Sequence, residues 1–263
     1  MKTRLLSLAF PFGLTAIVAV ALAHAATPKH LDVGLTLVDQ IAAAQAQGLY
    51  TDTDGATPLN RYGGAWKNAD DPSFIRFLDV ATNTRPANNT TCAPLVTHLL
   101  LTTYNWSWSK YSFTYTDAAG KTVTLKTASP KPEHYLLFIK NHVGFASQVT
   151  QFAQLQPGDI MAIALTATAV GHVTLLVGVD LASATPYPSD LAAANPALAG
   201  STFYAVTVLD SSSGVHTDDT RLVNVAGVVT QIPGIGTGKM GLLVGAHGDI
   251  LGHTWSLPTS DYA

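Results

Sequence analysis

The chain is organised around the stretch NNTTCAPLV, residues 88–96, which contains its only cysteine, Cys92. A threonine at position 90 or 91 can cap a helix that begins at Cys92, and Pro94 is tolerated because first-turn amides have no intrahelical acceptor. The residues that follow give this helix a wide apolar face, so we expect it to be buried and central. The face consists of Leu95, Val96, Leu99 and Leu100. A lone thiol at a helix N-terminus is either a small core residue or a nucleophile.

The start of the chain has the pattern of a secretory signal peptide. Lys2 and Arg4 form a basic start, residues 14–22 are mostly apolar, and residues 23–25 form a small-x-small cleavage site. We expect cleavage after Ala25, which leaves a mature chain of roughly 238 residues, secreted or periplasmic in a bacterium. The alternative is a retained anchor, but the apolar run is short and none later in the chain is long enough to span a bilayer. We expect no stable membrane insertion after cleavage.

Composition limits the classes of protein to which the chain can belong. The formal net charge is −3, and loss of Lys2 and Arg4 changes it to about −5. Nucleic-acid binding needs basic clusters and is not expected. One cysteine can form no internal disulfide, so stability has to come from a hydrophobic core, which a chain of this length can build as one domain. We expect a monomer.

The first part of the mature chain, residues 26–87, is expected to be a helical extension and loop in one compact domain with a catalytic part, residues 88–263. Residues 31–48 carry apolar side chains at helical spacing and end in glycine, as an amphipathic helix does. Residues 72–81 begin with proline and predict a short second helix. Between them, residues 62–66 predict a loop whose two glycines let the backbone approach a neighbour closely.

The remainder changes from helical to strand patterning. We expect a β-hairpin in which residues 112–115 pair with 122–125, followed by a helix over residues 132–142. Beyond residue 155, alternating and β-branched residues predict strands near 160–165, 172–179, 203–210, 221–229, 240–244 and 252–255. The prediction is an α+β fold with the nucleophile helix packed on an antiparallel sheet or half-barrel.

Two segments of the second half are expected to lie outside this sheet. Residues 180–202 form a Pro- and Ala-rich insertion, with a short helix at 191–194, that is a lid, a specificity loop or inert. The glycines between residues 234 and 241 have neither the strand-to-helix context nor the Lys-Ser/Thr pair of a phosphate loop, and predict a flexible connector.

Cys92 is well placed for nucleophilic chemistry. The unpaired amides and the positive dipole end of a helix stabilise a thiolate over a thiol, and the same amides can receive an oxyanion that develops beside the sulfur. The reaction also needs a base. His172 opens a strand directly after a hairpin predicted over the Thr-, Ala- and Gly-containing residues 166–171, at the edge of the sheet, and is the candidate.

A catalytic histidine needs a partner that fixes its tautomer, and strand lengths point to Asp210. If strands 172–179 and 203–210 are antiparallel neighbours of equal length, His172 lies opposite Asp210 on one face. A slip of one residue would place the two side chains on opposite faces. Ser211 and the two serines after it follow at once and can serve instead if the register differs.

The sequence segments around Cys92, His172 and Asp210, in this order along the chain, resemble the NlpC/P60 and CHAP group of papain-like cysteine hydrolases. The matching segments are TCAPLV at 91–96, LQPGDI at 155–160, GHV at 171–173 and VLDS at 208–211. The resemblance implies a papain-like fold and cleavage of an amide bond in cell-wall (peptidoglycan) peptides through a thioester, with Cys92 as nucleophile, His172 as base and Asp210 as third residue. It implies no cofactor. Thr91 and Ala93 stand where the group usually has Asp and Ser.

Three further residues are candidates for contacts with the oxyanion or the substrate. Members of the group often carry a tyrosine before the cysteine that helps to bind the oxyanion, and Tyr62 is the candidate, with a packing role as the alternative. Trp255 is a candidate wall of the substrate groove, and Ser211 a candidate substrate contact. The polar run from His216 to Arg221 is read as a solvated turn, with a loop at the rim of the site as the alternative.

A metal site and two other functions are the alternatives to thiol hydrolysis. His247 and His253 together with His172 fit no compact zinc motif, so no metal site is predicted. The alternatives to an amide hydrolase are a non-catalytic cell-wall binding module of the same fold, and an acyltransferase or esterase that uses the same thiol.

Overall fold

The structure is a computed structural model that describes residues 3–5, 17–22, 27–64, 71–107, 112–116, 120–126, 130–141, 146–163 and 171–257. Its α-helices are α1 (Lys29–Ala46), α2 (Cys92–Tyr104), α3 (Pro132–Lys140) and α4 (Ser189–Ala194). Its strands are β1 (Thr3–Leu5), β2 (Ile17–Leu22), β3 (Asn60–Tyr62), β4 (Phe74–Arg76), β5 (Ala87–Thr90), β6 (Ser112–Thr116), β7 (Thr122–Lys126), β8 (Gln148–Val149), β9 (Ile160–Ile163), β10 (His172–Pro186), β11 (Thr202–Ser212), β12 (Leu222–Val225), β13 (Val228–Gln231), β14 (Gly234–Val244) and β15 (Ile250–Thr254).

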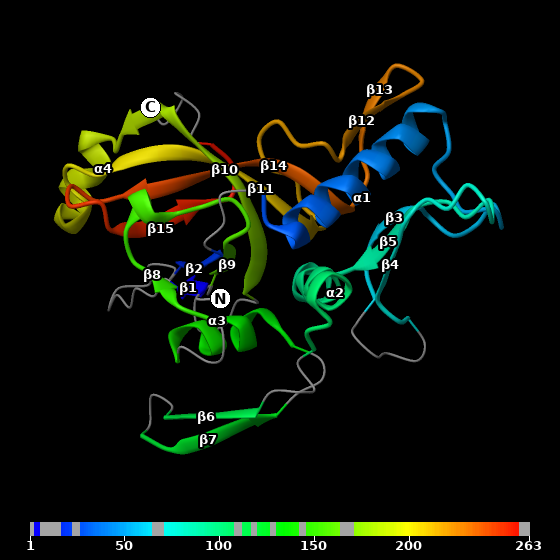
Figure 1. Ribbon diagram of the computed structural model, residues 1–263. Coiled ribbons are helices and arrows are strands. Elements are labelled where there is room, and N and C mark those ends of the chain that lie inside the picture. Colours follow the sequence, from blue (N-terminus) through cyan, green and yellow to red (C-terminus); the bar gives the residue numbers. More distant parts are fainter. Residues whose placement is uncertain are drawn as a thin grey trace.

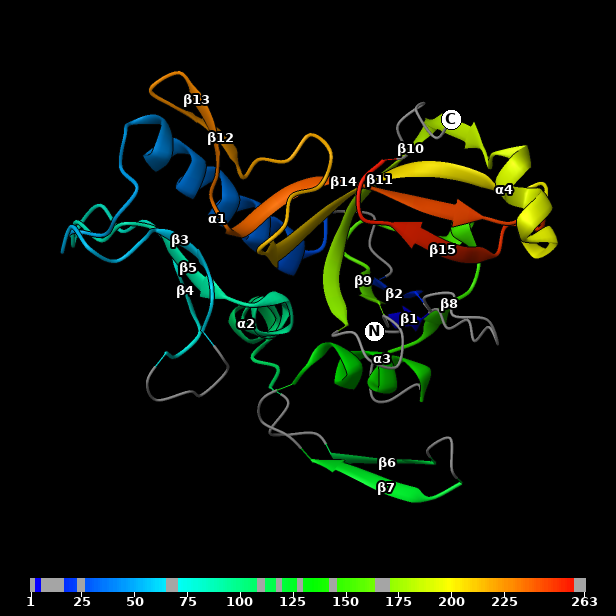
Figure 2. The same cartoon turned by 180° about the vertical axis from the view of Figure 1, so that it is seen from behind.

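The fold is α+β, and its largest sheet has eight strands in the order β1-β8-β2-β9-β10-β11-β14-β15. The pairings from β9 to β15 are all antiparallel. The long strands β10, β11 and β14 curl, so the sheet forms a half-barrel (Figure 1). Seen from either side, α2 lies between the lower end of β10 and the small sheet β3-β5-β4 (Figures 1 and 2). The predicted combination of helices and an antiparallel half-barrel is confirmed.

One hydrophobic core joins the helices to the sheet. It includes Leu37 of α1, Leu95 and Leu99 of α2 and Leu209 of β11, all 0% exposed. Burying one such side chain contributes about 1.5–3 kcal/mol, so this core is the main reason why α2 is fixed in place. The helix predicted over residues 31–48 is present as α1 and belongs to this core, together with the nucleophile helix.

The short helix predicted over residues 72–81 is wrong. Phe74–Arg76 is strand β4, which pairs antiparallel with β5, and a turn follows it. A proline at the start is equally compatible with an extended segment, and the aromatic and β-branched residues Phe74 and Ile75 favour a strand when a partner is available. The partner β5 leads directly to Cys92, so β4 supports the segment before the nucleophile.

The segment predicted as a flexible glycine connector is also wrong, because it is the first half of β14. That strand pairs with β11 without interruption from Thr202↔Val244 to Ser212↔Gly234. Glycines 234, 236 and 238 alternate along it and therefore share one face. Side chains from elsewhere fill the space over that face. A Cβ on Gly236 would lie 2.7 Å from Cγ of Arg221, and one on Gly238 would lie 2.7 Å from Cβ of His216.

Much of the predicted insertion is regular structure. β10 continues to Pro186, β11 begins at Thr202, and α4 covers the short helix that was predicted. The predicted hairpin is present as β6 and β7, with Ser112 paired to Lys126 and Thr116 to Thr122. The predicted helix over residues 132–142 is present as α3. The turn of the hairpin and the end of the strand predicted at 160–165 lie outside the described residues.

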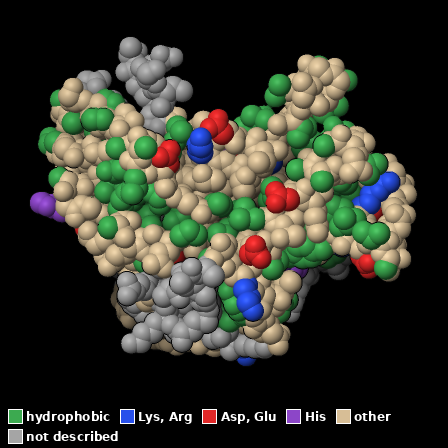
Figure 3. All heavy atoms as spheres, turned by 45° about the horizontal axis from the view of Figure 1, so that its top comes forward, with side chains coloured by type: hydrophobic (Ala, Val, Ile, Leu, Met, Phe, Trp, Pro, Cys, Tyr) green, Lys and Arg blue, Asp and Glu red, His purple; other side chains and the backbone are tan. Residues whose placement is uncertain are grey.

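The N-terminal strands lie beside β8 and β9 in the large sheet. Ile17 of β2 pairs with Ile163 of β9, and Leu5 of β1 pairs with Gln148 of β8. Cleavage after Ala25 would remove both strands and uncover that edge, and the signal peptide stays a prediction. Within the described residues, no helix has the length and apolar character needed to cross a bilayer. On the face shown in Figure 3, the described Lys and Arg side chains lie apart from one another and form no continuous basic patch.

Candidate active site

Cys92 is the first residue of α2, at the junction between the small sheet and the helix. The residue before it, Thr91, is the N-cap but makes no side-chain capping hydrogen bond. Thr90 is held instead, because its carbonyl accepts a hydrogen bond of 2.6 Å from Oγ of the fully buried Ser211. This bond ties β5, the strand that leads to the cysteine, to β11, the strand that carries Asp210. Cys92 is 5% exposed.

His172 and Asp210 lie together, although not through the pairing predicted. β10 and β11 are antiparallel neighbours, but Leu175 pairs with Leu209, which places Thr174 opposite Asp210 and His172 two residues further along. The predicted pair of Val179 with Phe203 is wrong, since Val179 pairs with Val206. The strands are longer than predicted, with β10 running to Pro186 and β11 to Ser212, so their ends are not opposed as equal lengths would require. A slip of two residues keeps both side chains on one face, so the predicted proximity holds despite the register error.

The two side chains are hydrogen bonded at short distance. Nε2 of His172 lies 2.6 Å from Oδ2 of Asp210. Since the carboxylate oxygen accepts, Nε2 carries the hydrogen and Nδ1 is the nitrogen left to interact with Cys92. The side chain of Cys92 lies close enough to the ring to raise the pKa of His172. Cys92, His172 and Asp210 therefore form one connected group.

Burial by itself would lower the pKa of His172, but its partners outweigh that effect. The charge of Cys92 and the hydrogen bonds to Asp210 and Cys92 raise the pKa to about 10. Burial would raise the pKa of the Asp210 carboxyl, yet its hydrogen bonds to two histidines and the nearby Arg221 hold that pKa far below its usual range. The ring of His172 is thus held as an imidazolium against a permanent carboxylate.

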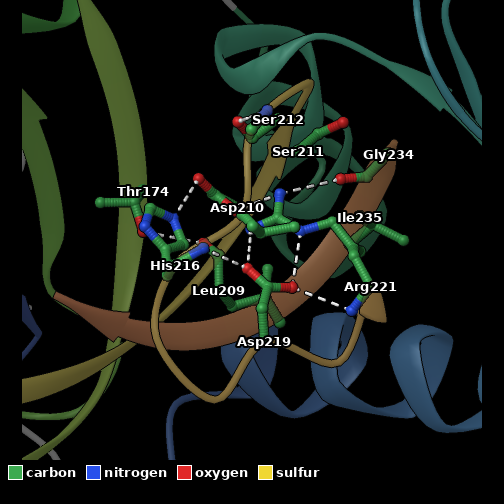
Figure 4. A network of polar contacts seen from close by, with 12 residues as sticks. Thr174, Leu209, Asp210, Ser211, Ser212, His216, Asp219, Arg221, Gly234 and Ile235 are labelled. Carbon is green, nitrogen blue, oxygen red and sulfur yellow. Dashed lines mark hydrogen bonds and ion pairs between the residues drawn. The ribbon is translucent and has the colours of Figure 1, made fainter. Parts of the chain in front are cut away.

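Asp210 has two further partners that come from the loop after β11. Nε2 of His216 lies 3.0 Å from Oδ2 of Asp210, and Nη1 of Arg221 lies 2.9 Å from Oδ1. Arg221 also binds Asp219, with contacts of 2.8 Å from Nε and 2.6 Å from Nη2. Figure 4 shows these side chains converging on Asp210 from a single loop. His216, Asp219 and Arg221 are all buried, so the interpretation as a solvated turn is wrong for them.

The loop that contains His216 and Arg221 fits over β14 because that strand has glycine where the loop crosses it. Gly236 pairs with Asp210, and Gly238 lies two residues further along the same face. The absence of side chains at these two positions leaves room for the side chain of Arg221 at Gly236, and for Cβ of His216 and the carboxylate of Asp219 at Gly238. The alternation of these glycines, in a segment predicted as a flexible connector, was the sequence signal for this buried loop, since glycine in a strand marks a close approach of other groups.

Two of the predicted substrate-contacting residues border the same group. Tyr62 ends β3 and pairs with Thr90, and burial together with the charges of Cys92 and Asp210 raises its pKa to about 12. The ring of Trp255 stands edge-on to that of His172, with 5.0 Å between centroids, and its Nε1 donates to the carbonyl of Val215. The substrate-binding role predicted for Ser211 stays a prediction, and its bond to Thr90 favours a supporting role.

The described residues contain no group of three or more His, Cys, Asp or Glu side chains arranged to hold a metal ion. His253, on β15, lies near enough for the charges of His172 and His216 to act on it. Burial and those two charges lower its pKa to about 4, so it is neutral at physiological pH.

Comparison of this chain with protein-family models, with curated proteins and with solved structures found no match in any of the three. The functional interpretation therefore depends on the geometry of the site.

Proposed function

We propose that the protein is a papain-like cysteine hydrolase that cleaves an amide bond through a thioester on Cys92. One observation carries the proposal: a histidine fixed by a buried carboxylate at Nε2, with its other nitrogen left for a cysteine at a helix N-terminus. A structural cysteine needs no such partner, whereas nucleophile, base and orienting acid are the three parts that thiol catalysis requires.

The reaction follows from the charge state of the group. The Cys92 thiolate attacks the carbonyl carbon, and the C–N bond breaks as the imidazolium of His172 protonates the leaving amine. Water then attacks the thioester while neutral His172 removes its proton. The C–S bond breaks, the acid product leaves, and the thiolate and imidazolium are restored. Asp210 stays ionised throughout and keeps Nε2 protonated.

Each tetrahedral intermediate carries an oxyanion that needs hydrogen-bond donors. We assign the backbone amide of Cys92 as one donor and the hydroxyl of Tyr62 as the second. The phenol is suited to this role because its raised pKa keeps it protonated, and therefore a donor, at any physiological pH. Trp255 covers the edge of His172 and is assigned as a wall of the site.

The class of substrate rests on the resemblance to the NlpC/P60 and CHAP group, which points to peptides of the bacterial cell wall. A secretory signal would deliver the enzyme to that compartment. Both the cell-wall substrate and export are parts of the proposal.

A product screen with mass analysis of the protein tests the proposal. Full-length protein and Cys92→Ala are incubated with muropeptides and, separately, with small acyl esters. We expect new amines from the muropeptides and an acyl adduct on Cys92 in the unaltered protein alone. Products from esters only would favour the acyltransferase or esterase alternative. A folded protein that forms neither products nor an adduct would favour the non-catalytic binding module.

A further inference from the structure

We propose that His216 is a positioning residue that holds the catalytic imidazole of His172 from two sides, through Asp210 and through Trp255. The inference rests on the proposed function, because it assigns a role within the same site. It concerns a histidine that contributes no group to the chemical steps described above.

On the first side, His216 and His172 share one carboxylate oxygen of Asp210. Oδ2 of Asp210 accepts from Nε2 of His172 at 2.6 Å and from Nε2 of His216 at 3.0 Å. Arg221 holds the other oxygen, Oδ1, so the carboxylate is fixed at both ends. Without His216, Oδ2 loses one of its two donors and the carboxylate can rotate about the contact with Arg221. The ring of His172 would follow that rotation.

On the second side, His216 contacts Trp255, the residue assigned as a wall of the site. Nδ1 of His216 lies 2.7 Å from the backbone carbonyl of Trp255, and the two rings lie 4.3 Å apart between centroids. The same indole stands edge-on to His172. His216 therefore connects Asp210, which binds His172 by a hydrogen bond, with Trp255, whose ring packs against that of His172.

Both nitrogens of His216 lie within hydrogen-bond distance of an oxygen, a backbone carbonyl at Nδ1 and a carboxylate at Nε2, so the ring is held at both ends. The charged groups around it are Asp210, Asp219, Arg221 and His172, with neutral His253 nearby. The guanidinium of Arg221 pairs with both carboxylates, at Oδ1 of Asp210 and at Oδ2 of Asp219. Such pairing is what makes a buried cluster of charges tolerable.

The backbone and packing of His216 hold it in this position. Its amide donates to Oδ2 of Asp219 at 2.7 Å, and Gly238 leaves the space for its Cβ. A Cβ added at Gly238 would lie 2.7 Å from Cβ of His216 and 2.9 Å from Oδ2 of Asp219. Gly238→Ala therefore displaces His216 without removing a polar group.

Two amide substitutions separate the two contacts. In His216→Gln the amide nitrogen takes the place of Nε2 and keeps the bond to Asp210, whereas in His216→Asn it takes the place of Nδ1 and keeps only the bond to Trp255. We expect His216→Asn and Gly238→Ala to lower kcat by about 10- to 100-fold with little change in KM, since displacement of a catalytic group has effects of this size. His216→Gln should recover most of that loss. Asp218→Asn, in the neighbouring exposed turn, is the matched control and should leave kcat unchanged.

A spectroscopic measurement keeps this test independent of turnover. The proton shared by His172 and Asp210 gives a low-field NMR resonance, which should persist in His216→Gln and broaden or vanish in His216→Asn. Equal kcat and an unchanged resonance in all variants would overturn the inference, as would equal losses in His216→Gln and His216→Asn at matched melting temperatures. An inactive unaltered protein would refute the proposed function, and the resonance would still test the positioning role.

Discussion

Two neighbouring aspartates have opposite environments. Asp218 lies in an exposed turn and binds Nζ of Lys239 at 2.6 Å, with side chains 63% and 39% exposed. Asp219 turns inward and binds Arg221 at the same distance, with both side chains 0% exposed. The left-handed backbone at Asp218, with φ of 52°, sends successive side chains in opposite directions. The two ion pairs have the same length, but only the buried one reaches the candidate site, so burial and not distance separates a functional pair from an incidental one.

The largest effect is expected from removing the carboxylate that joins the buried cluster to the site. Asp210→Asn cannot keep His172 in the required tautomer and charge state, so kcat should fall by about 10²- to 10⁴-fold. Steady-state kinetics on the substrate found in the product screen would measure this. Asp218→Asn is the control, and equal losses in both variants would remove the distinction between the two pairs.

Breaking the buried ion pair should destabilise the fold strongly. Arg221→Met leaves Asp219 and Asp210 without their guanidinium partner inside the protein, and we expect a loss of about 3–5 kcal/mol in the free energy of unfolding. Urea unfolding followed by tryptophan fluorescence gives this quantity. A loss under about 1 kcal/mol would mean that water reaches the cluster and that it behaves like an exposed pair.

The buried cluster should also give stability a defined pH dependence. The pKa of His172 is raised from 6.5 to about 10, so its contribution is complete below pH 6.5 and disappears as pH rises through 10. The lowered pKa of Asp210 gives a contribution present above its ordinary value of 3.8 and lost as pH falls below it. The stability difference between the unaltered protein and Asp210→Asn should therefore be largest between those limits. A difference that does not vary with pH would contradict the assigned charges.

Filling the glycine face of β14 should have an intermediate effect. Gly238→Ala forces a Cβ against His216 and Asp219, which should cost about 1–3 kcal/mol of stability. Gly178→Ala, on β10, is the control because no atom lies within 4 Å of the added Cβ. If the two substitutions have the same effect on the melting temperature, the glycines of β14 are not there to make room for the loop.

The smallest effect is expected at the exposed pair. Lys239→Met should change stability by at most about 1 kcal/mol, and salt near 1 M should remove what difference there is. The same salt should leave the effect of Arg221→Met almost unchanged. A large loss of stability in Lys239→Met that persists at high salt would show that the exposed pair stabilises the fold as a buried pair does.

The sequence predicted the parts of this site that depend on local pattern. Helix α2 was predicted from the spacing of Leu95, Val96, Leu99 and Leu100, and the strands of His172 and Asp210 from alternation and their length. Their register was wrong because both strands run past their predicted ends, to Pro186 and to Ser212, and their face was right because a slip of two residues preserves it.

The support around Asp210 could not be predicted in the same way. His216, Asp219 and Arg221 have the composition of a solvated turn, and their burial depends on glycines at 236 and 238 from a strand that follows them in the chain. The strand β4 was missed for a similar reason, since its partner β5 decides its conformation. Where a contact partner is distant in the chain, periodicity carries no information about it.

The central claim is that His172, held by Asp210, activates Cys92, and alkylation of the thiol tests it most directly. Iodoacetamide is applied to the native protein near neutral pH, and Cys92 modification is followed by mass for the unaltered protein, His172→Gln and Asp218→Asn. We expect rapid alkylation in the unaltered protein and in Asp218→Asn, and a rate at least about tenfold lower in His172→Gln because the thiolate has lost its imidazolium. Equal rates in all three would contradict the claim and leave Cys92 a core residue.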